Sequence, residues 1–294
     1  MKTLVFGEIL WDIIEGTPHL GGAPLNFAAH SQRFENKATI ISSVGKDNLG
    51  DRAIALVEEL EINTDYIQRS ALPTGTVPVE IITGQPHYEI TKDVAFDDIK
   101  EQHLGGLLLE HFELFYFGTL IQRNKTSASS LHYILEQMHF RHIFYDVNLR
   151  RDSYNLDTIL YSLSHCTLLK VNDEEVDVLS EMIFGSRLTI ENFCTQVSTQ
   201  FSKVEVIVVT LGKSGSSIYA SGILHHIPTA PINVVDTVGA GDAFSAAFAS
   251  TYLNTSDPIK SATIANKIGG YVASNHGPIP AYSEVIREEI KLTM

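Results

Sequence analysis

The chain has 294 residues, of which 44% are hydrophobic, enough to bury the core of one large α/β domain. Its 21 Lys and Arg against 35 Asp and Glu give a formal net charge of −14. An acidic chain without a basic cluster is a poor partner for nucleic acid or for an anionic membrane surface. No apolar run approaches the length that spans a bilayer, and Glu8 comes too early for a signal peptide. We therefore expect a cytoplasmic protein that binds neither nucleic acid nor membrane.

Apolar runs of strand length alternate along the chain with stretches of helical periodicity. The runs are nearly continuous, as expected for strands buried on both faces, and cover residues 3–6, 39–44, 114–117, 142–147, 167–171 and 204–210. Helices are predicted over residues 24–34, 51–60, 126–137, 173–181, 190–201, 240–252 and 259–274. This order predicts an α/β fold with a doubly wound, mostly parallel sheet flanked by helices.

Two segments interrupt this alternation. Residues 9–20 contain a turn signal, and residues 74–91 alternate polar and apolar side chains around Gly84-Gln85-Pro86, which predicts a hairpin. Because period-two segments suit a half-exposed sheet, we expect a small β-sheet lid formed by about residues 9–20 and 74–100. The lid would project from a single domain over residues 1–294. The alternative is a pair of surface hairpins without a role in closure.

Polar residues and glycines gather where the predicted strands end. In parallel sheets, ligands bind beyond the carboxyl ends of the strands. The segments at these ends are Gly45-Lys46-Asp47, Gly118-Thr119, Asn148-Leu149-Arg150, Asn172 with the acidic residues after it, and Gly212-Lys213-Ser214-Gly215. Each of them alone suits an ordinary loop, but together they line one edge of one sheet.

The sharpest feature is the segment Asp236-Thr237-Val238-Gly239-Ala240-Gly241-Asp242 before a predicted helix. Small residues let backbone N–H groups approach a phosphate, and the helix start directs its positive dipole end at the same point. Gly239, Ala240 and Gly241 would then form an anion hole for a transferring phosphoryl group. Asp242 would accept the proton of the acceptor hydroxyl as the catalytic base. The alternative is a capped helix start, and the two carboxylates that bracket the turn favour the catalytic interpretation.

This segment resembles the C-terminal signature of the ribokinase-like (PfkB) carbohydrate kinases, Asp-Thr-x-Gly-Ala-Gly-Asp. The segment Gly21-Gly22-Ala23-Pro24-Leu25-Asn26-Phe27-Ala28 resembles the N-terminal Gly-Gly signature of that family in its fructokinase form. Further matches are Val44-Gly45-Lys46-Asp47-Asn48-Leu49-Gly50 and Asn172-Asp173-Glu174-Glu175, the latter similar to the Asn-x-x-Glu motif. The four motifs occur in family order across nearly the whole chain.

The resemblance implies that a sugar binds between the sheet edge and the lid. The residues that it assigns to the sugar are Asp12, Gly21, Gly22, Asn26 and Asp242. Without the resemblance, Asp12 suits a solvated turn and Asn26 a helix start. Arg123 is a further substrate candidate, which either reaches the sugar or packs on the surface.

ATP and Mg²⁺ are the cofactors that the resemblance implies. The nucleotide-binding residues would be Lys170, Asn172, Thr210, Gly212, Gly215, Gly241 and Asn266. Asn172 and Glu175 would hold the water shell of Mg²⁺. Many family members also bind K⁺, and here the ligands would be Asp236 with the backbone carbonyls of Val238, Val272, Asn275 and Gly277. Ala281 stands where a serine can ligate the ion, so K⁺ activation is left open.

Three segments resemble the fructokinase branch more than ribokinase: Gly21 to Ala28, Leu120-Ile121-Gln122-Arg123 and Asp146-Val147-Asn148-Leu149-Arg150. The resemblance therefore implies transfer of the ATP γ-phosphate to fructose, giving fructose 6-phosphate. Ribose, other ketoses, 2-keto-3-deoxygluconate and nucleosides stay open as substrates, and so does a homodimer through the lid. The rival class is a non-catalytic sugar-binding protein on the same fold. An oxidoreductase is disfavoured because the dinucleotide-binding glycines are absent.

Overall fold

The computed structural model describes residues 1–82 and 85–291. Its strands are β1 Lys2–Phe6, β2 Leu10–Ile14, β3 Thr17–Gly21, β4 Lys37–Gly45, β5 Ile67–Ser70, β6 Gly75–Ile82, β7 Gln85–Tyr88, β8 Leu114–Gly118, β9 His142–Asp146, β10 Leu168–Asn172, β11 Val206–Thr210, β12 Ser216–Ala220 and β13 Ile223–Ile227. Its α-helices are α1 Ala23–Gln32, α2 Asn48–Glu59, α3 Lys125–Gln137, α4 Leu156–His165, α5 Asp173–Phe184, α6 Ile190–Gln200, α7 Ala240–Thr255, α8 Pro258–Ala273 and α9 Glu284–Lys291.

The larger sheet has the strand order β13-β12-β11-β10-β9-β8-β1-β4-β5 within the described residues. Every pairing from β11 to β5 is parallel, and only β12 and β13 at one edge are antiparallel. The predicted mostly parallel sheet is confirmed. The two antiparallel strands are absent from the sequence-based prediction.

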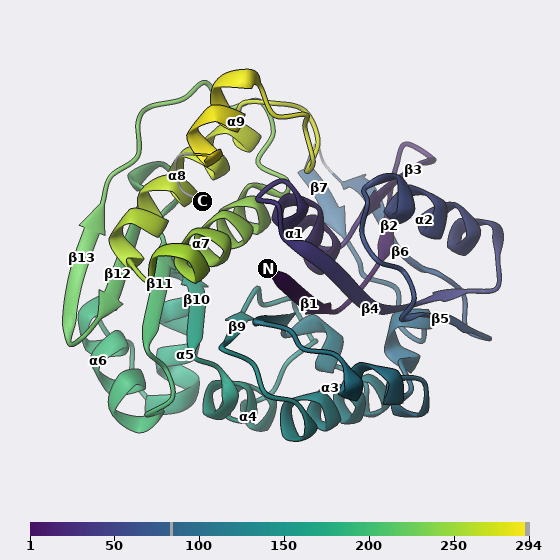
Figure 1. Ribbon diagram of the computed structural model, residues 1–294, viewed down its shortest axis with the longest axis horizontal. Helices are drawn as coiled ribbons and strands as arrows, with labels where there is room; N and C mark the ends of the chain where they lie inside the picture. The colour runs from purple at the N-terminus through teal and green to yellow at the C-terminus, as the bar shows by residue number, and fades with distance from the viewer. Residues whose placement is uncertain (83–84, 292–294) are drawn as a thin grey trace.

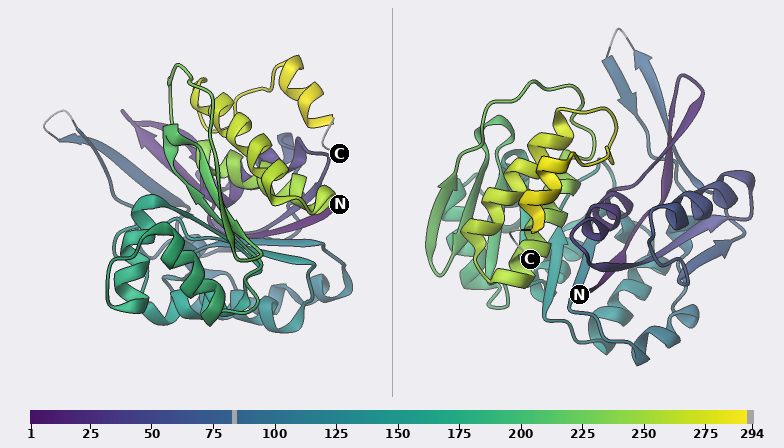
Figure 2. Two further views of the ribbon diagram at one scale, coloured as in Figure 1. Left: turned by 90° about the vertical axis from the view of Figure 1, so that its left-hand side faces the viewer. Right: turned by 45° about the horizontal axis from the view of Figure 1, so that its top comes forward.

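Helices cover both faces of this sheet (Figure 1). Helices α3 to α6 lie on one face, and α1, α2, α7 and α8 lie on the other (Figure 2). Neighbouring residues of β1 belong to different cores: Val5 packs with Phe27 and Phe248 on one side, whereas Phe6 packs with Leu131 on the other. A strand buried on both faces needs apolar side chains at every position, which explains the continuous apolar runs.

A separate small sheet has the order β3-β2-β6-β7. Strand β2 pairs antiparallel with β3 and parallel with β6, and β6 pairs antiparallel with β7. Figure 2 shows β6 and β7 projecting away from the helix-covered body. The strands end at Tyr88, and the 3₁₀ turn Ala95–Asp98 places Phe96 fully buried in a core. Residues 89–100 thus lie outside the strands of the small sheet, and Gly84 of the predicted turn lies outside the described residues.

No helix in the described parts of the chain is both long enough and apolar enough to cross a bilayer.

Candidate active site

The predicted site residues lie around the carboxyl ends of β1, β9, β10 and β11 and the first turns of α1 and α7. Parallel strands bring their carboxyl ends to one edge, so segments far apart in sequence meet there. The closest such meeting is between Asn26 of α1 and Asp242 of α7. The Asn26 Nδ2 donates to Asp242 Oδ2 at 2.8 Å across 216 residues of sequence.

Two glycines let the lid, β1 and α1 come together. Gly22 precedes α1 with φ +117°, and a Cβ added there would lie 2.4 Å from the backbone oxygen of Glu8. A Cβ added at Gly21 would lie 2.8 Å from Oδ2 of Asp12, which is on lid strand β2. A side chain at Gly22 would therefore push the backbone after β1 away from α1, whereas one at Gly21 would displace the flexible Asp12 side chain.

The backbone that begins α7 has the conformation expected of an anion hole. Gly239 lies just before the helix with φ +76°, in the left-handed region that favours glycine. Ala240 and Gly241 follow as the first helical residues, where backbone N–H groups have no partner within the helix. Asp242 lies in this same first turn. The Ala240 N–H already donates to the Thr237 carbonyl at 3.2 Å, and the base candidate shares this turn with the Gly241 N–H.

The Asp242 carboxyl group is partly exposed, but the protein around it displaces most of its water. Burial raises the pKa of Asp242 to about 6. The hydrogen bond from Asn26 opposes this rise, and the nearby Asp146 adds to it. A carboxyl group with this pKa is ionised at neutral pH and can take a proton. The second Asn26 amide atom, Oδ1, is buried without a hydrogen-bond partner among the described residues.

Lys170 lies beneath the anion hole in an ion pair that the sequence did not reveal. Its Nζ donates to Oδ1 of Asp146 at 2.9 Å, and the two side chains are 9% and 0% exposed. The same Nζ would lie 3.6 Å from a Cβ added at Gly241. The predicted nucleotide residue Lys170 thus places a buried positive charge directly beside the start of α7.

Glu8 is a second buried acid at this site, and the sequence analysis assigned it no role. It follows β1 and borders a small cavity together with Ala23, Pro24, Tyr116, Gly118, Thr119, Leu120 and Asn148. Burial raises the pKa of Glu8 to about 7, Asp242 raises it further, and Arg150 opposes the rise. Burial also raises the pKa of Asp12, again opposed by Arg150. Its position at the carboxyl end of a parallel strand was the signal that could have identified Glu8.

The predicted Mg²⁺ residues form the start of α5. The Asn172 side chain accepts from the Glu175 N–H at 2.7 Å, and Glu175 Oε2 accepts from the Asn172 N–H at 2.8 Å. The other Glu175 oxygen accepts from the Leu149 N–H at 2.7 Å. These oxygens are ligands of the kind that Mg²⁺ prefers, and each keeps lone pairs that can accept a hydrogen bond from a water bound to the ion. Among the described residues no three His, Cys, Asp or Glu side chains gather for direct coordination, so the fit is to a hydrated ion.

Asp236 and the predicted K⁺ ligands lie where two loops meet. Asp236 Oδ1 accepts from the Val238 N–H at 3.0 Å, and Oδ2 accepts from the Gly277 N–H at 3.1 Å. The carbonyl of Val272 accepts from the Asn275 N–H at 2.9 Å. Asp236 thus ties the loop before α7 to the loop after α8. Its oxygens retain lone pairs for a cation, so K⁺ binding is compatible with these contacts and stays a prediction.

The remaining residues predicted to bind the nucleotide lie at the end of β11, in the turn after it and on α8. Thr210 ends β11 beside Asn172 of β10. A Cβ added at Gly215 would lie 2.2 Å from the backbone oxygen of Ile227, so this turn requires glycine, whereas Gly212 has open space around it. Asn266 donates to the Ile227 carbonyl at 3.0 Å, which joins α8 to the end of β13. These residues form one continuous border of the site.

The sequence profile described as pfkB family carbohydrate kinase matches residues 6–284. The chain belongs to this family. The pfkB family is defined by activity on carbohydrates, and the match extends over the whole site described above. The chain is therefore a sugar kinase.

Named relatives of this pfkB kinase act on several acceptors. "Probable fructokinase-5" of Arabidopsis thaliana is 23% identical over 308 residues, covering 94% of this chain and 92% of the relative. An ATP-dependent 6-phosphofructokinase of Thermoanaerobacterium thermosaccharolyticum is 26% identical over 264 residues, covering 83% and 79%. The crystal structure of a fructokinase with bound ATP from Xylella fastidiosa matches with a TM-score of 0.88 at 19% identity, covering 99% of this chain and 98% of that one. The structural likeness confirms the ribokinase-like fold.

The Arg123 guanidinium of this pfkB kinase is held by hydrogen bonds to other residues of the chain. Its Nε and Nη2 donate to the two Asp97 oxygens at 2.7 and 2.8 Å, and Nη2 also donates to the Thr91 carbonyl. The guanidinium lies over the Phe96 ring, 4.8 Å from its centroid. Arg123 therefore anchors the segment after the lid, and its predicted contact with the sugar gains no support from these contacts.

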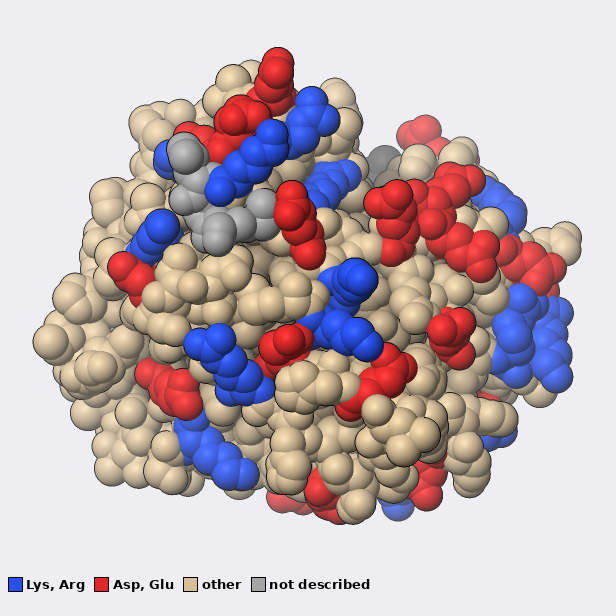
Figure 3. Space-filling view, in the orientation of Figure 1, with Lys and Arg blue, Asp and Glu red and all other residues tan. Residues whose placement is uncertain are grey.

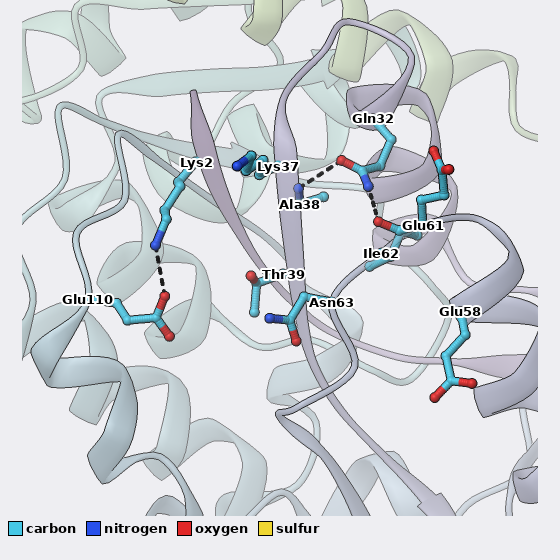
Figure 4. A pocket seen from close by; sticks show the side chains of 10 residues that line it. All are labelled: Lys2, Gln32, Lys37, Ala38, Thr39, Glu58, Glu61, Ile62, Asn63 and Glu110. Carbon is cyan, nitrogen blue, oxygen red and sulfur yellow. Dashed lines mark hydrogen bonds and ion pairs between the residues drawn. The ribbon is translucent and has the colours of Figure 1, made fainter.

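A second hollow of about 570 Å³ lies at the opposite edge of the large sheet (Figure 4). It is bordered by Lys2 and Lys37, at the amino ends of β1 and β4. Lys2 pairs with Glu110 at 3.0 Å, and the Gln32 side chain bridges Ala38 and Glu61 of the backbone. Since these polar groups satisfy one another, we assign no ligand to this hollow of the pfkB kinase.

Charged side chains are mixed on the face of the pfkB kinase shown in Figure 3. Lys and Arg are scattered there among Asp and Glu, without a continuous basic stripe among the described residues. Nucleic-acid binders need such a stripe to neutralise successive phosphates.

Proposed function

We propose that this sugar kinase transfers the γ-phosphate of ATP to fructose, giving fructose 6-phosphate. The observation that carries the proposal is the meeting of Asn26 and Asp242 at 2.8 Å beside the backbone of Gly239, Ala240 and Gly241. A base and backbone N–H donors lie in the first turn of α7, and the group that orients the base lies opposite on α1. A phosphoryl transfer site requires all three.

In the proposed reaction, Asp12, Gly22 and Asn26 hold the sugar at the base of the lid. Asp242 takes the proton of the acceptor hydroxyl as its oxygen forms a bond to the γ-phosphorus. The bond between this phosphorus and the bridging oxygen of ADP breaks in line. The N–H groups of Gly239, Ala240 and Gly241 and the Lys170 ammonium hold the charge on the moving group. The proton ends on Asp242, and the electron pair of the broken P–O bond stays on the oxygen of ADP.

Asn172 and Glu175 would hold Mg²⁺ through its water shell, and Mg²⁺ would neutralise charge on the ATP phosphates. A structural neighbour of this chain, with a TM-score of 0.83, was solved in complex with ATP and Mg²⁺. Thr210, Gly212, Gly215 and Asn266 would border the nucleotide. K⁺ at Asp236 and the carbonyls of Val238, Val272, Asn275 and Gly277 would be an activator.

Fructose is favoured over acidic acceptors by the charges at the sugar end of the site. Glu8, Asp12 and Asp242 all lie there, and Arg150 is the cation that influences all three. Arg123, a further cation, is already paired with Asp97. An added carboxylate or phosphate on the substrate would meet three acids, whereas a neutral sugar offers hydroxyl donors to them. A fructokinase from Vibrio cholerae with a TM-score of 0.83 was solved with fructose and ADP bound.

The test is ADP release by the purified chain with Mg²⁺ and a panel of acceptors, with and without K⁺. The panel contains fructose, ribose, 2-keto-3-deoxygluconate, fructose 6-phosphate and a nucleoside. We expect the highest kcat/KM with fructose. Turnover of an acidic acceptor at a higher kcat/KM would contradict the proposed substrate. Sugar binding without ADP release for every acceptor would support the non-catalytic alternative instead.

A further inference from the structure

A buried cluster joins three neighbouring strands to the helix that carries the base. Asp146 of β9 accepts from the Lys170 ammonium at 2.9 Å through one oxygen. Its other oxygen accepts from the Ser245 hydroxyl at 2.8 Å and the Tyr116 hydroxyl at 3.2 Å. Asp146 and Ser245 are fully buried, and Tyr116 is 1% exposed. The cluster thus links β8, β9, β10 and α7 away from water.

Asp146 is the anion paired with the buried Lys170 ammonium. A buried charge that loses its partner is costly. Asp146 and Lys170 stand directly opposite each other on paired strands, so their distance is fixed by the sheet.

The other end of the cluster lies against the anion hole. The Ser245 hydroxyl lies between Asp146 and the Gly241 carbonyl, and it donates to this carbonyl at 3.0 Å. Ser245 lies one helical turn after the anion hole. The Lys170 Nζ would lie 3.6 Å from a Cβ added at Gly241. One carboxylate therefore holds both the cation and the helix start that the proposed reaction uses.

We propose that Asp146 is a positioning residue of the phosphate site, which holds the Lys170 ammonium and the start of α7 together before ATP binds. The inference rests on the proposed function and adds a residue to which no role had been given. Asp146 acts through Lys170 and touches neither sugar nor ATP. Removing its charge should therefore weaken nucleotide binding and leave sugar binding in place.

The experiment compares Asp146→Asn, Lys170→Met and the double variant with the unaltered chain. Calorimetry measures the Kd of a non-hydrolysable ATP analogue with Mg²⁺ and, separately, the Kd of fructose. Hydrogen bonds to charged groups contribute enough that we expect about 10- to 100-fold weaker nucleotide binding in each single variant. The fructose Kd should change less than about threefold. The double variant should bind the nucleotide no more weakly than Lys170→Met, because the two residues act as one unit.

Val197→Ala is the control for general destabilisation, since Val197 is fully buried in α6 and away from the site. It should lower the Tm without changing the nucleotide Kd. Nucleotide binding by Asp146→Asn equal to that of the unaltered chain would overturn the inference. A similar loss of both ligands would also overturn it, because it would indicate a purely structural role. If Asp146→Asn does not fold, the double variant decides: weaker binding than Lys170→Met contradicts the inference.

The two proposals fail separately. An unaltered chain that releases no ADP with any acceptor contradicts the proposed function. An unaltered chain that phosphorylates fructose while Asp146→Asn binds nucleotide normally contradicts only the role of Asp146.

Discussion

The surroundings of the Asp242 carboxyl group set the pH range in which it can act as a base. Burial raises its pKa to about 6, and only the ionised form accepts a proton. As the pH falls through 6, Asp242 becomes protonated, so kcat/KM should decrease about tenfold per pH unit below that value. Initial rates from pH 5 to pH 8 measure this limb. A flat profile down to pH 5 would contradict the assignment of the base.

Asn26 provides a second test at the scale of one residue. Its hydrogen bond stabilises the ionised form of Asp242 and so lowers the pKa of that group. Asn26→Leu removes the hydrogen bond at similar volume, and we expect the acid limb to move to higher pH by about one unit. The measurement is the pH profile of kcat/KM for this variant.

Glu8→Gln is the control for that shift, because Glu8 has a pKa of about 7 and titrates in the same range. With this pKa, Glu8 is already mostly neutral where Asp242 titrates, so its charge does not set the pKa of Asp242. The limb of Glu8→Gln should therefore stay near pH 6, whereas that of Asn26→Leu moves to higher pH. Equal shifts in both variants would assign the limb to something other than Asp242.

Contacts between residues far apart in sequence were the part of the site that the sequence could not predict. The motifs named both Asn26 and Asp242 as site candidates, yet nothing in them indicated that the fold brings the two together across 216 residues of sequence. The Lys170–Asp146 pair forms because β9 and β10 are neighbours in the sheet. The sequence of a strand does not predict which strand will lie beside it. Local signals were sufficient for Gly22 and Gly239, whose positive φ angles favour glycine, because backbone conformation is a local property.

At the scale of elements, α1 connects the base to the C-terminal segment. His30 lies 2.6 Å from the Tyr282 hydroxyl and 2.9 Å from the Pro278 carbonyl. Arg33 donates to the Pro280 carbonyl at 2.5 Å and lies over the Tyr282 ring. These contacts hold Pro278 against Gly239 at the start of α7. One helix therefore positions both Asn26 and the segment that supports the anion hole.

A matched pair of glycines tests this support. Gly239 and Gly185 both lie at helix ends, with φ of +76° and +73°. A Cβ added at Gly239 would lie 2.5 Å from Pro278, whereas a Cβ at Gly185 would meet nothing within 4 Å. Gly185→Ala should cost about 1 kcal/mol in the free energy of unfolding and leave kcat unchanged. Gly239→Ala should cost more and lower kcat about tenfold or further, since the N–H groups of the hole move.

Urea unfolding and initial rates measure both effects. Similar rates for Gly239→Ala and Gly185→Ala would contradict the packing of Pro278 as a support for the anion hole.

The bounds of several elements differ from those predicted, because local sequence preferences compete with capping and tertiary contacts. Residues 51–60 were predicted as a helix, but α2 begins at Asn48, because Asp47 caps it by accepting from the Gly50 N–H at 2.8 Å. Gly50 disfavours a helix on its own, and the tertiary contacts of this turn override that preference. Strand β12 was missed because two serines begin it, and β13 because exposed histidines interrupt its apolar run at the edge of the sheet. The missed helix α4 begins at Leu156 and is capped by Asn155, whose side chain accepts from the Thr158 N–H.

At the scale of the whole molecule, the small sheet has two free edges. Strands β3 and β7 end the sheet within the described residues, and unpaired edges can accept strands of another chain. The predicted homodimer through the lid would use this sheet. Light scattering should then give a molar mass near twice 32.5 kDa, and a mass near 32.5 kDa would contradict it.

The proposed reaction depends on proton transfer to the Asp242 carboxyl group, which lies between the first turns of α1 and α7. The most direct measurement is the rate of γ-phosphate transfer from ATP to fructose by the unaltered chain and by Asp242→Asn, together with the fructose Kd of each. Loss of a general base typically lowers a rate by about 10²–10⁴, and we expect a loss in that range with the fructose Kd little changed. Near-normal transfer by Asp242→Asn would contradict the account.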